Sequence, residues 1–335
     1  MTKLAAFACG AALLLVPAAA PATDAPQPRL RVLAFTKTAA FRHDSIPAAV
    51  RAVRELGAAN GIAVDATEDG SAFADARLAR YDAVIFLLTT GDVLDGAQQE
   101  AFERYVRGGG GYAGVHSAAD TEYDWPWYGE LVGTYFRNHP AVQRAAIDVL
   151  AREASTARLP RRWVRTDEWY SFRSSPSTRV RVLARLDEGS YDPGGSAMGA
   201  DHPIAWAHDV GKGRSWYTGG GHTQEAYAEP LFRAHLLGGV LYAAGYGKPR
   251  IASLAVAARS RRVSVDVRGA GCLRCTGRVR VRTAGRWRTT ALRAAGDRLR
   301  GTTGVLPRGP LRLEVVLEER ATGLTATAVR TVTVR

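Results

Sequence analysis

The stretch YDAVIFLLTT, residues Tyr81 to Thr90, decides the fold class. Its middle is an almost unbroken apolar run, which is typical of a strand buried on both faces within a parallel sheet. A helix pattern, Ile46–Gly61, precedes it and ends on Asn-Gly. A second helix pattern, 95–111, follows it, begins at Asp95 and ends in four glycines. Strands that alternate with helices predict an α/β domain with a doubly wound sheet.

The same alternation continues on both sides and covers residues 29–247. The further strand patterns are Leu30–Thr36, Ile62–Thr67, Gly111–Ser117, Arg179–Leu186 and Gly213–Gly221, and the closing helix pattern is Glu229–Gly245. We therefore expect a mostly parallel, flavodoxin-like sheet. Ligands of such sheets bind beyond the carboxyl ends of the strands.

A second domain, residues 251–335, is predicted after the segment GYGKPR (245–250). Apolar residues recur there with a period of two between turn residues, which indicates a small all-β, immunoglobulin-like sandwich. Cys272 and Cys275 are its two cysteines, and it has no histidine. Because a zinc site needs more ligands than these, we expect a disulfide between them.

The first 22 residues have the pattern of a secretory signal peptide. Lys3 precedes the apolar run Leu4–Val16, and Ala20-Pro21-Ala22 supplies small residues for cleavage. No later run of about 18 apolar residues exists, so a membrane span is not expected. The pattern predicts a secreted protein.

The net charge of +13 belongs to the second domain. Residues 251–335 contain 18 basic and 5 acidic side chains, and the rest of the chain holds 27 of each sign. A basic module can bind an anionic cell-wall polymer. The alternative, a solvated arginine face on a strand-rich domain, is favoured. Nucleic-acid-binding motifs are missing from the sequence, so no nucleic-acid partner is expected.

All seven histidines lie in the first domain, and three of them directly follow predicted strands. These three are His43, His116 and His222. One isolated histidine is most simply explained as a structural residue. Three at equivalent ends of parallel strands would converge on one crevice, which favours a functional site.

Acidic and aromatic side chains lie close to these histidines in the sequence. Carboxylates there could act as acid, base or metal ligand, and aromatic rings could bind sugar rings, although core packing is their commoner role. The candidate substrate-binding residues are His43, Asp120, Trp125, His139, Asp167, Trp169, Tyr170, His202 and Trp206.

Four motifs in order resemble those of the ThuA-like (trehalose utilisation) family over roughly Arg31–Gly245. They are FRHDS, GGGGYAGVHSAAD, DEWYSF and HPIAWAHDVGKGRSWYTGGGHTQEAY. The resemblance implies a fold similar to class I glutamine amidotransferases, in which a G-x-C-x-G elbow presents a cysteine. A histidine and a glutamate complete the triad of those enzymes. Here His116 occupies the cysteine position, His222 resembles the triad histidine, and Glu225 lies one residue further away than the usual spacing.

An imidazole cannot form the thioester of glutamine hydrolysis, so glutaminase activity is excluded. A histidine at an elbow can carry a proton or bind a metal. We favour acid/base catalysis by His116 and His222, with Glu168 or Glu225 orienting one imidazole. A divalent metal held with Glu168 stays open, although no spacing such as H-E-x-x-H supports it. No other cofactor is expected.

The resemblance implies a sugar substrate, namely an oxidised (keto) disaccharide or a glycoside. The sequence thus predicts an exported enzyme that acts on a small sugar or glycan. The alternatives are a non-catalytic sugar-binding module and a scaffold attached to the cell wall.

Overall fold

The strands of the first domain form one nine-stranded sheet. The computed structural model describes residues 30–295 and 297–335, so the predicted signal peptide lies outside the described residues. The strand order is β2-β1-β3-β4-β11-β10-β9-β6-β7. The strands are β1 (Leu30–Phe35), β2 (Ile62–Thr67), β3 (Ala83–Leu87), β4 (Gly111–Val115), β6 (Gln143–Val149), β7 (Arg162–Asp167), β9 (Arg181–Asp187), β10 (Pro203–Val210) and β11 (Gly213–Thr218).

The sheet has a parallel half and an antiparallel half. Neighbouring strands from β2 to β11 run parallel. The pairs from β11 to β7 are antiparallel. All five residues of β3 are buried, as the apolar run predicts. The α/β fold class is confirmed, and the antiparallel half enlarges the sheet beyond its parallel strands. A separate small ribbon joins β5 (Phe136–Asn138) to β8 (Ser171–Phe172).

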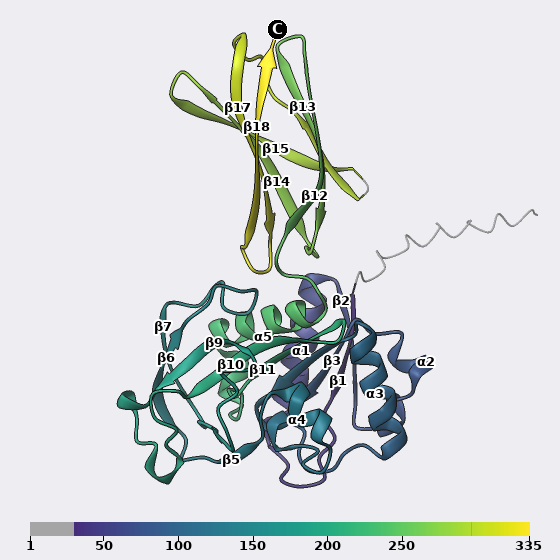
Figure 1. Ribbon diagram of the computed structural model, residues 1–335, viewed down its shortest axis with the longest axis vertical. Coiled ribbons are helices and arrows are strands. Elements are labelled where there is room, and N and C mark those ends of the chain that lie inside the picture. Colours follow the sequence, from purple (N-terminus) through teal and green to yellow (C-terminus); the bar gives the residue numbers. More distant parts are fainter. Residues whose placement is uncertain (1–29, 296) are drawn as a thin grey trace, which may run out of the picture.

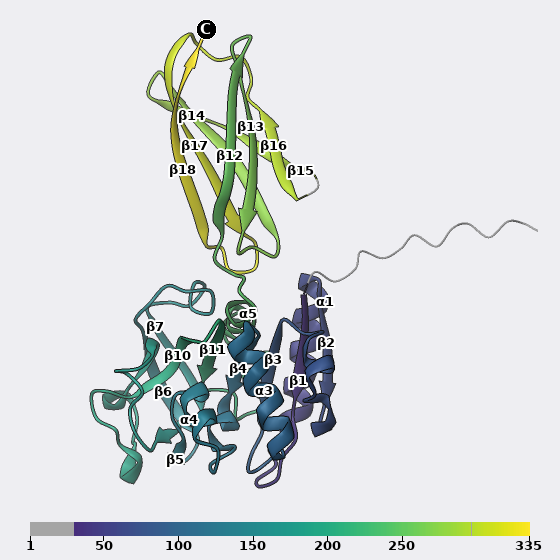
Figure 2. The same cartoon turned by 45° about the vertical axis from the view of Figure 1, so that its right-hand side comes forward.

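Helices cover both faces of this sheet (Figure 1). They are α1 (Ile46–Asn60), α2 (Asp75–Leu78), α3 (Gly96–Gly108), α4 (Pro126–Val132) and α5 (Pro230–Ala243). Helices α1 and α5 pack together on one face, while α2, α3 and α4 lie on the other (Figure 2). Asp95 caps α3 through a capping box with Gln98. Helix α1 ends at Gly61, whose φ of 73° suits a residue without Cβ.

The second domain is the predicted β-sandwich. Its strands are β12 (Arg250–Arg259), β13 (Arg262–Ala270), β14 (Cys275–Thr283), β15 (Arg286–Ala295), β16 (Arg298–Thr302), β17 (Gly309–Glu319) and β18 (Thr325–Val334). The order is β12-β13-β16-β15-β14-β17-β18. Strand β15 crosses between the layers, because its first part pairs with β14 and its end pairs with β16. Inward-facing valines and leucines form the core.

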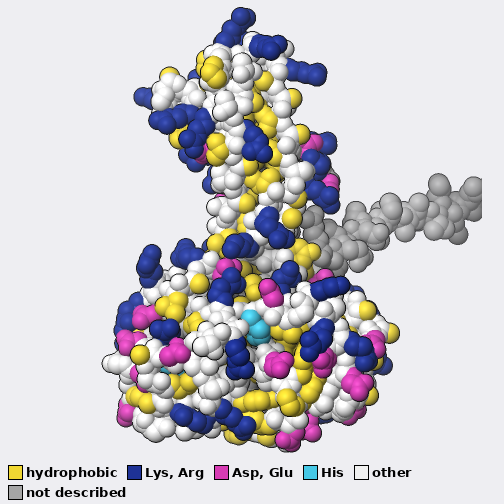
Figure 3. Space-filling model, in the orientation of Figure 1, with side chains coloured by type: hydrophobic (Ala, Val, Ile, Leu, Met, Phe, Trp, Pro, Cys, Tyr) yellow, Lys and Arg dark blue, Asp and Glu magenta, His cyan; other side chains and the backbone are white. Residues whose placement is uncertain are grey.

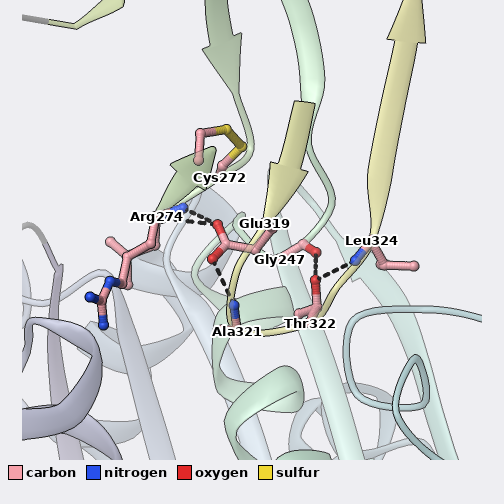
Figure 4. Close-up of a disulfide and its surroundings, with 9 residues drawn as sticks. Gly247, Cys272, Arg274, Glu319, Ala321, Thr322 and Leu324 are labelled. Atoms are coloured by element: carbon pink, nitrogen blue, oxygen red, sulfur yellow. Dashed lines mark hydrogen bonds between the residues drawn. A yellow bond between two sulfur atoms is a disulfide. The ribbon is translucent and has the colours of Figure 1, made fainter. Parts of the chain in front are cut away.

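The domain junction is a short segment supported by hydrogen bonds (Figure 4). Cys272 and Cys275 form the expected disulfide. The buried Glu319 carboxylate accepts hydrogen bonds from the backbone N–H groups of Leu273 and Arg274, at 2.6 and 3.0 Å. Thr322 donates its hydroxyl to the Gly247 carbonyl at 2.8 Å. These bonds fix the turns of the sandwich that face the first domain.

Arginine side chains from both domains complete the junction. Arg158 donates to the carbonyls of Arg320 and Ala321, both at 2.7 Å. Arg274 reaches back to the Ala59 carbonyl at the end of α1, at 2.7 Å. In the described part of the chain, no helix is long and apolar enough to span a membrane.

Candidate active site

The carboxyl ends of the strands bring three histidines and one glutamate together. His116 follows β4, His43 follows β1, and His222 follows the glycine-rich loop after β11. Glu168 follows β7, at the far side of the antiparallel half. The loops after β7 and β11 meet above β4, so the site forms at the edge where ligands of such sheets bind.

His116 sits on a strained elbow between β4 and a short 3-10 helix. Its φ is 52°, in the left-handed region that non-glycine residues seldom adopt. The carbonyl of His116 accepts the Tyr217 hydroxyl at 2.7 Å, and Nδ1–H of its ring donates to the Gly219 carbonyl at 2.8 Å. Because Nδ1 is occupied by this hydrogen bond, Nε2 is the ring nitrogen that faces the site.

Three polar atoms form an almost equilateral triangle. His116 Nε2 and His222 Nδ1 are 3.3 Å apart. Glu168 Oε2 lies 3.3 Å from each of them. With one nitrogen of His43, the set comprises four potential ligand atoms that all lie within 4.8 Å of one another. We call His43, His116, Glu168 and His222 the histidine cluster.

Burial and the interactions among the four residues of the cluster determine which of their side chains are charged. Burial alone would raise the pKa of Glu168, but the imidazoles of His116 and His222, each 3.3 Å from its Oε2, outweigh this effect and lower that pKa below its ordinary range. Burial and the neighbouring imidazoles lower the pKa of His43 to about 3. The contact with Glu168 raises the pKa of His222. The cluster therefore pairs an ionised carboxylate with a neutral, buried His43.

Solvent reaches the cluster from one side. The His116 side chain is fully buried and that of Glu168 is 7% exposed, whereas that of His222 is 24% exposed. His139 flanks Glu168, with its Nδ1 3.1 Å from Oε1, and its side chain is 41% exposed. The three histidines converge as expected. A ligand can reach the cluster only on the side where His222 and His139 are exposed.

Two other predicted residues line the cluster from the protein side. The ring centroid of Tyr170 lies 4.0 Å from that of His116. The side chain of Asp120, half-buried, accepts the Tyr123 hydroxyl at 2.6 Å. Burial raises the pKa of Asp120. Tyr170 is itself buried, so it supports the imidazole and offers no platform to a sugar.

Three of the residues expected to bind substrate, Trp169, Trp206 and His202, lie in the core and offer no surface to a ligand. All three are completely buried. The indole N–H groups of Trp169 and Trp206 donate to backbone carbonyls at 2.8 Å. His202 lies between the Glu188 carboxylate and the Tyr170 carbonyl. These side chains satisfy their polar atoms inside the core, as buried aromatic and polar groups must.

Trp125 and Glu225 also differ from the expectation. Trp125 is half-buried against Trp127, with ring centroids 4.9 Å apart. Glu225 is exposed on a short 3-10 helix, and its carboxylate makes no hydrogen bond or ion pair with the described residues. Of the two glutamates proposed to orient an imidazole, the structure brings Glu168 to the histidines.

Asp167 holds the loop that carries His222. Its buried carboxylate accepts the backbone N–H of Gly221 at 2.7 Å and that of His222 at 3.1 Å. It is ion-paired with Arg165, a buried guanidinium that also binds Glu229 at 2.9 Å. Asp167 therefore positions the loop and does not face a substrate. Sequence analysis missed Arg165 and Glu229. The sequence pattern that could have revealed Arg165 is its period-two spacing from Asp167.

The fold and the site together define a class of protein: a doubly wound α/β domain with a histidine at the elbow that follows β4. Residues 31–243 match the model of the ThuA family, described as trehalose utilisation. The chain belongs to the ThuA family.

Solved structures agree with this assignment. A ThuA-like protein from Bacteroides uniformis is 25% identical, with a TM-score of 0.58, over 69% of this chain and 97% of its own. A ThuA-like protein from Parabacteroides merdae is 18% identical, with a TM-score of 0.54, over 64% of this chain and 90% of its own. No curated protein matches the chain.

Proposed function

We propose that this protein is an exported enzyme that acts on a small carbohydrate, with the histidine cluster as its reaction centre. The family description, trehalose utilisation, supports the substrate class. Within that class we favour a glycoside or an oxidised (keto) sugar. The signal-peptide pattern of residues 1–22 supports export.

The observation that carries the proposal is the convergence of three imidazoles on one carboxylate. The structural histidine of the last helix looks different. His235 lies in the core and its Nδ1 binds the Ser155 carbonyl at 2.9 Å. By contrast, the Nδ1 atom of His43 is buried and has no hydrogen-bond partner among the described residues. Buried polar atoms without partners cost stability and concentrate at functional sites.

The cluster suits proton exchange with a sugar. Its accessible edge, at His222, can meet a hydroxyl group or an acidic C–H bond beside a carbonyl. Removal or delivery of such a proton is the step common to hydrolases, lyases and isomerases that act on sugars. The elbow that holds His116 has no thiol, so amide transfer from glutamine is not proposed.

A second proposal, which competes with the solvated arginine face that the sequence favours, is that the basic sandwich attaches the enzyme to an anionic polymer of the cell wall. Dark blue Lys and Arg side chains gather on this domain with few acidic ones between them (Figure 3). The difference of 13 between its basic and acidic residues gives it a strongly positive field. This role is separate from catalysis and has its own test below.

A pair of matched glutamate variants tests the reaction centre. We would assay the mature protein with keto-disaccharides and with the parent disaccharides, and follow the products by chromatography. Glu168→Gln should lower kcat/KM at least about 100-fold, the lower bound for a typical acid/base group. Glu225→Gln, the same change at an exposed glutamate, should keep the wild-type rate.

Unchanged turnover in Glu168→Gln, with wild-type turnover on the same sugar, would contradict the proposal. His116→Ala adds a second criterion, because a loss of only about tenfold would indicate a positioning role. Binding of a sugar without turnover in the wild-type protein would instead support the non-catalytic alternative. Circular dichroism of each variant checks that the fold is retained.

A further inference from the structure

We infer that the histidine cluster binds one divalent transition-metal ion of the Zn²⁺ type, through His43, His116, Glu168 and His222. The inference deepens the proposed function by naming what its reaction centre holds. It shares the site with that proposal, but its test does not require a sugar.

The triangle of ligand atoms has the dimensions of a tetrahedral metal site. Zn²⁺ lies about 2.0–2.1 Å from imidazole nitrogens and about 2.0–2.2 Å from carboxylate oxygens. The edge of a tetrahedron is about 1.63 times this distance, roughly 3.3–3.6 Å. The three separations among His116 Nε2, His222 Nδ1 and Glu168 Oε2 are each 3.3 Å. An ion just above this triangle would be at bonding distance from all three atoms.

Ordinary hydrogen bonds in the same protein are shorter. His202 Nδ1 lies 2.7 Å from Glu188 Oε1, which is the normal distance for a histidine paired with a carboxylate. His116 Nδ1 lies 2.8 Å from the Gly219 carbonyl. The distances of 3.3 Å around Glu168 Oε2 are therefore long for proton-mediated pairs.

The surrounding groups prepare the ligands for a metal. The Gly219 carbonyl holds a proton of His116 on Nδ1, so Nε2 faces the triangle and would supply the lone pair to a bound ion. Metal-bound histidines usually donate their other N–H to such an oxygen. On the carboxylate side, His139 Nδ1 contacts the second oxygen of Glu168 at 3.1 Å. The ligating oxygen Oε2 is thus left to the two imidazoles.

His43 supplies the fourth group. It is 4% exposed and its Nδ1 has no hydrogen-bond partner among the described residues. One of its ring nitrogens lies within 4.8 Å of the other three ligand atoms. A metal ion gives this buried imidazole a role that no hydrogen bond in the described structure supplies.

Three imidazoles and one carboxylate select the kind of ion. Imidazole suits Zn²⁺, Ni²⁺, Cu²⁺ and Fe²⁺, whereas Mg²⁺ and Ca²⁺ prefer sites made of oxygen ligands. The exposed edge of His222 leaves access for a water molecule or a substrate oxygen as a fifth ligand beside the four protein ligands. Water on such an ion can deprotonate near neutral pH. In the metal-bound protein this water, and not His222, would exchange the proton of the proposed reaction.

Metal titration of the full mature chain, purified without a histidine tag and stripped with a chelator, tests the inference. We expect isothermal titration calorimetry to show one equivalent of Zn²⁺ bound. Co²⁺ should give the intense visible absorption of a tetrahedral site with nitrogen and oxygen ligands. Glu168→Gln and His222→Ala should lose the stoichiometric binding and the Co²⁺ spectrum.

Glu225→Gln is the matched control and should bind one equivalent with the wild-type spectrum. The melting temperature should rise with Zn²⁺ in the wild type and in this control, and should stay constant in Glu168→Gln. A stripped wild-type protein that is folded and binds neither ion would overturn the inference, as would unchanged binding in Glu168→Gln. Because these readouts need no sugar, an inactive but metal-binding protein would contradict only the proposed function.

Discussion

At the residue scale, the same side chain has different roles because its surroundings differ. His116 is held at a φ of 52° by its neighbours, and strain of this kind persists where the surrounding structure compensates for it. His43 and His116 were predictable as site residues because each follows a strand pattern of the parallel half. Glu168 could be named only as one of two candidates, because the strand that carries it was not recognised.

His235 provides a prediction about pH. Burial, with the charge of Arg165 adding to it, lowers its pKa to about 4, although its hydrogen bond to Ser155 opposes the shift. Between the unfolded pKa of 6.5 and about 4, only the unfolded chain binds this proton. The free energy of unfolding should therefore fall as the pH drops through this range, by at most about 1.4 kcal/mol per pH unit from this group.

Urea unfolding of wild type and His235→Gln at several pH values measures this effect. The glutamine variant should be less stable at pH 7 because it disturbs a packed core, but its stability should depend less steeply on pH between 6.5 and 4. Identical slopes for the two proteins would show that His235 does not contribute.

At the element scale, a strand could be predicted from its sequence when its buried residues are apolar, and was missed when they include charged residues. Strand β3 is apolar throughout and was recognised from its sequence. Strand β7 buries alternate residues, and its inward residues are Trp163, Arg165 and Asp167. Because two of these three are charged, the expected alternation of apolar and polar residues is lost. The antiparallel half, and with it the approach of Glu168 to the histidines, depends on an ion pair that hydrophobic periodicity does not reveal.

Helix α5 carries a prediction about packing. A Cβ atom at Gly239 would lie 2.4 Å from ring atoms of Trp216 in β11. Gly239→Ala should therefore destabilise the protein by about 1–3 kcal/mol, as overpacking of a core does, although alanine favours helix formation.

Gly96→Ala in α3 is the control, because nothing lies within 4 Å of its Cβ position. Chemical denaturation of both variants should show a loss for Gly239→Ala and none for Gly96→Ala. Equal stability of Gly239→Ala and wild type would mean that α5 moves away from β11 at little cost.

At the scale of the whole molecule, charge and chemistry lie in different domains. The histidine cluster belongs to the α/β domain, whereas the positive charge belongs to the sandwich. The division into two domains was predictable from the change in the period of the apolar residues and from the position of the charged residues. The contacts between the domains were not, because they are hydrogen bonds from arginine and threonine side chains to backbone carbonyls.

The proposed attachment predicts binding to a polyanion through β14. Arg278, Arg280 and Arg282 alternate with the buried Val279 and Val281, so they share the outer face of the sandwich. The wild-type chain should be retained on a heparin column and elute with added salt. The triple change of the three arginines to glutamine should elute at lower salt, because fewer counterions are exchanged.

A second triple variant keeps the change in charge equal. Arg51, Arg54 and Arg80 are exposed in the α/β domain, and their change to glutamine should leave elution close to that of the wild type. Equal shifts for both variants would show that net charge alone causes retention, and would argue against a binding face on the sandwich.

The most direct measurement for the histidine cluster as a single centre is an anomalous difference map, recorded at the zinc edge from crystals equilibrated with Zn²⁺. We expect one peak about 2.0–2.2 Å from His116 Nε2, His222 Nδ1 and Glu168 Oε2, with a nitrogen of His43 completing the site. A map with no peak at the cluster, or with zinc bound only at surface residues, would contradict the account.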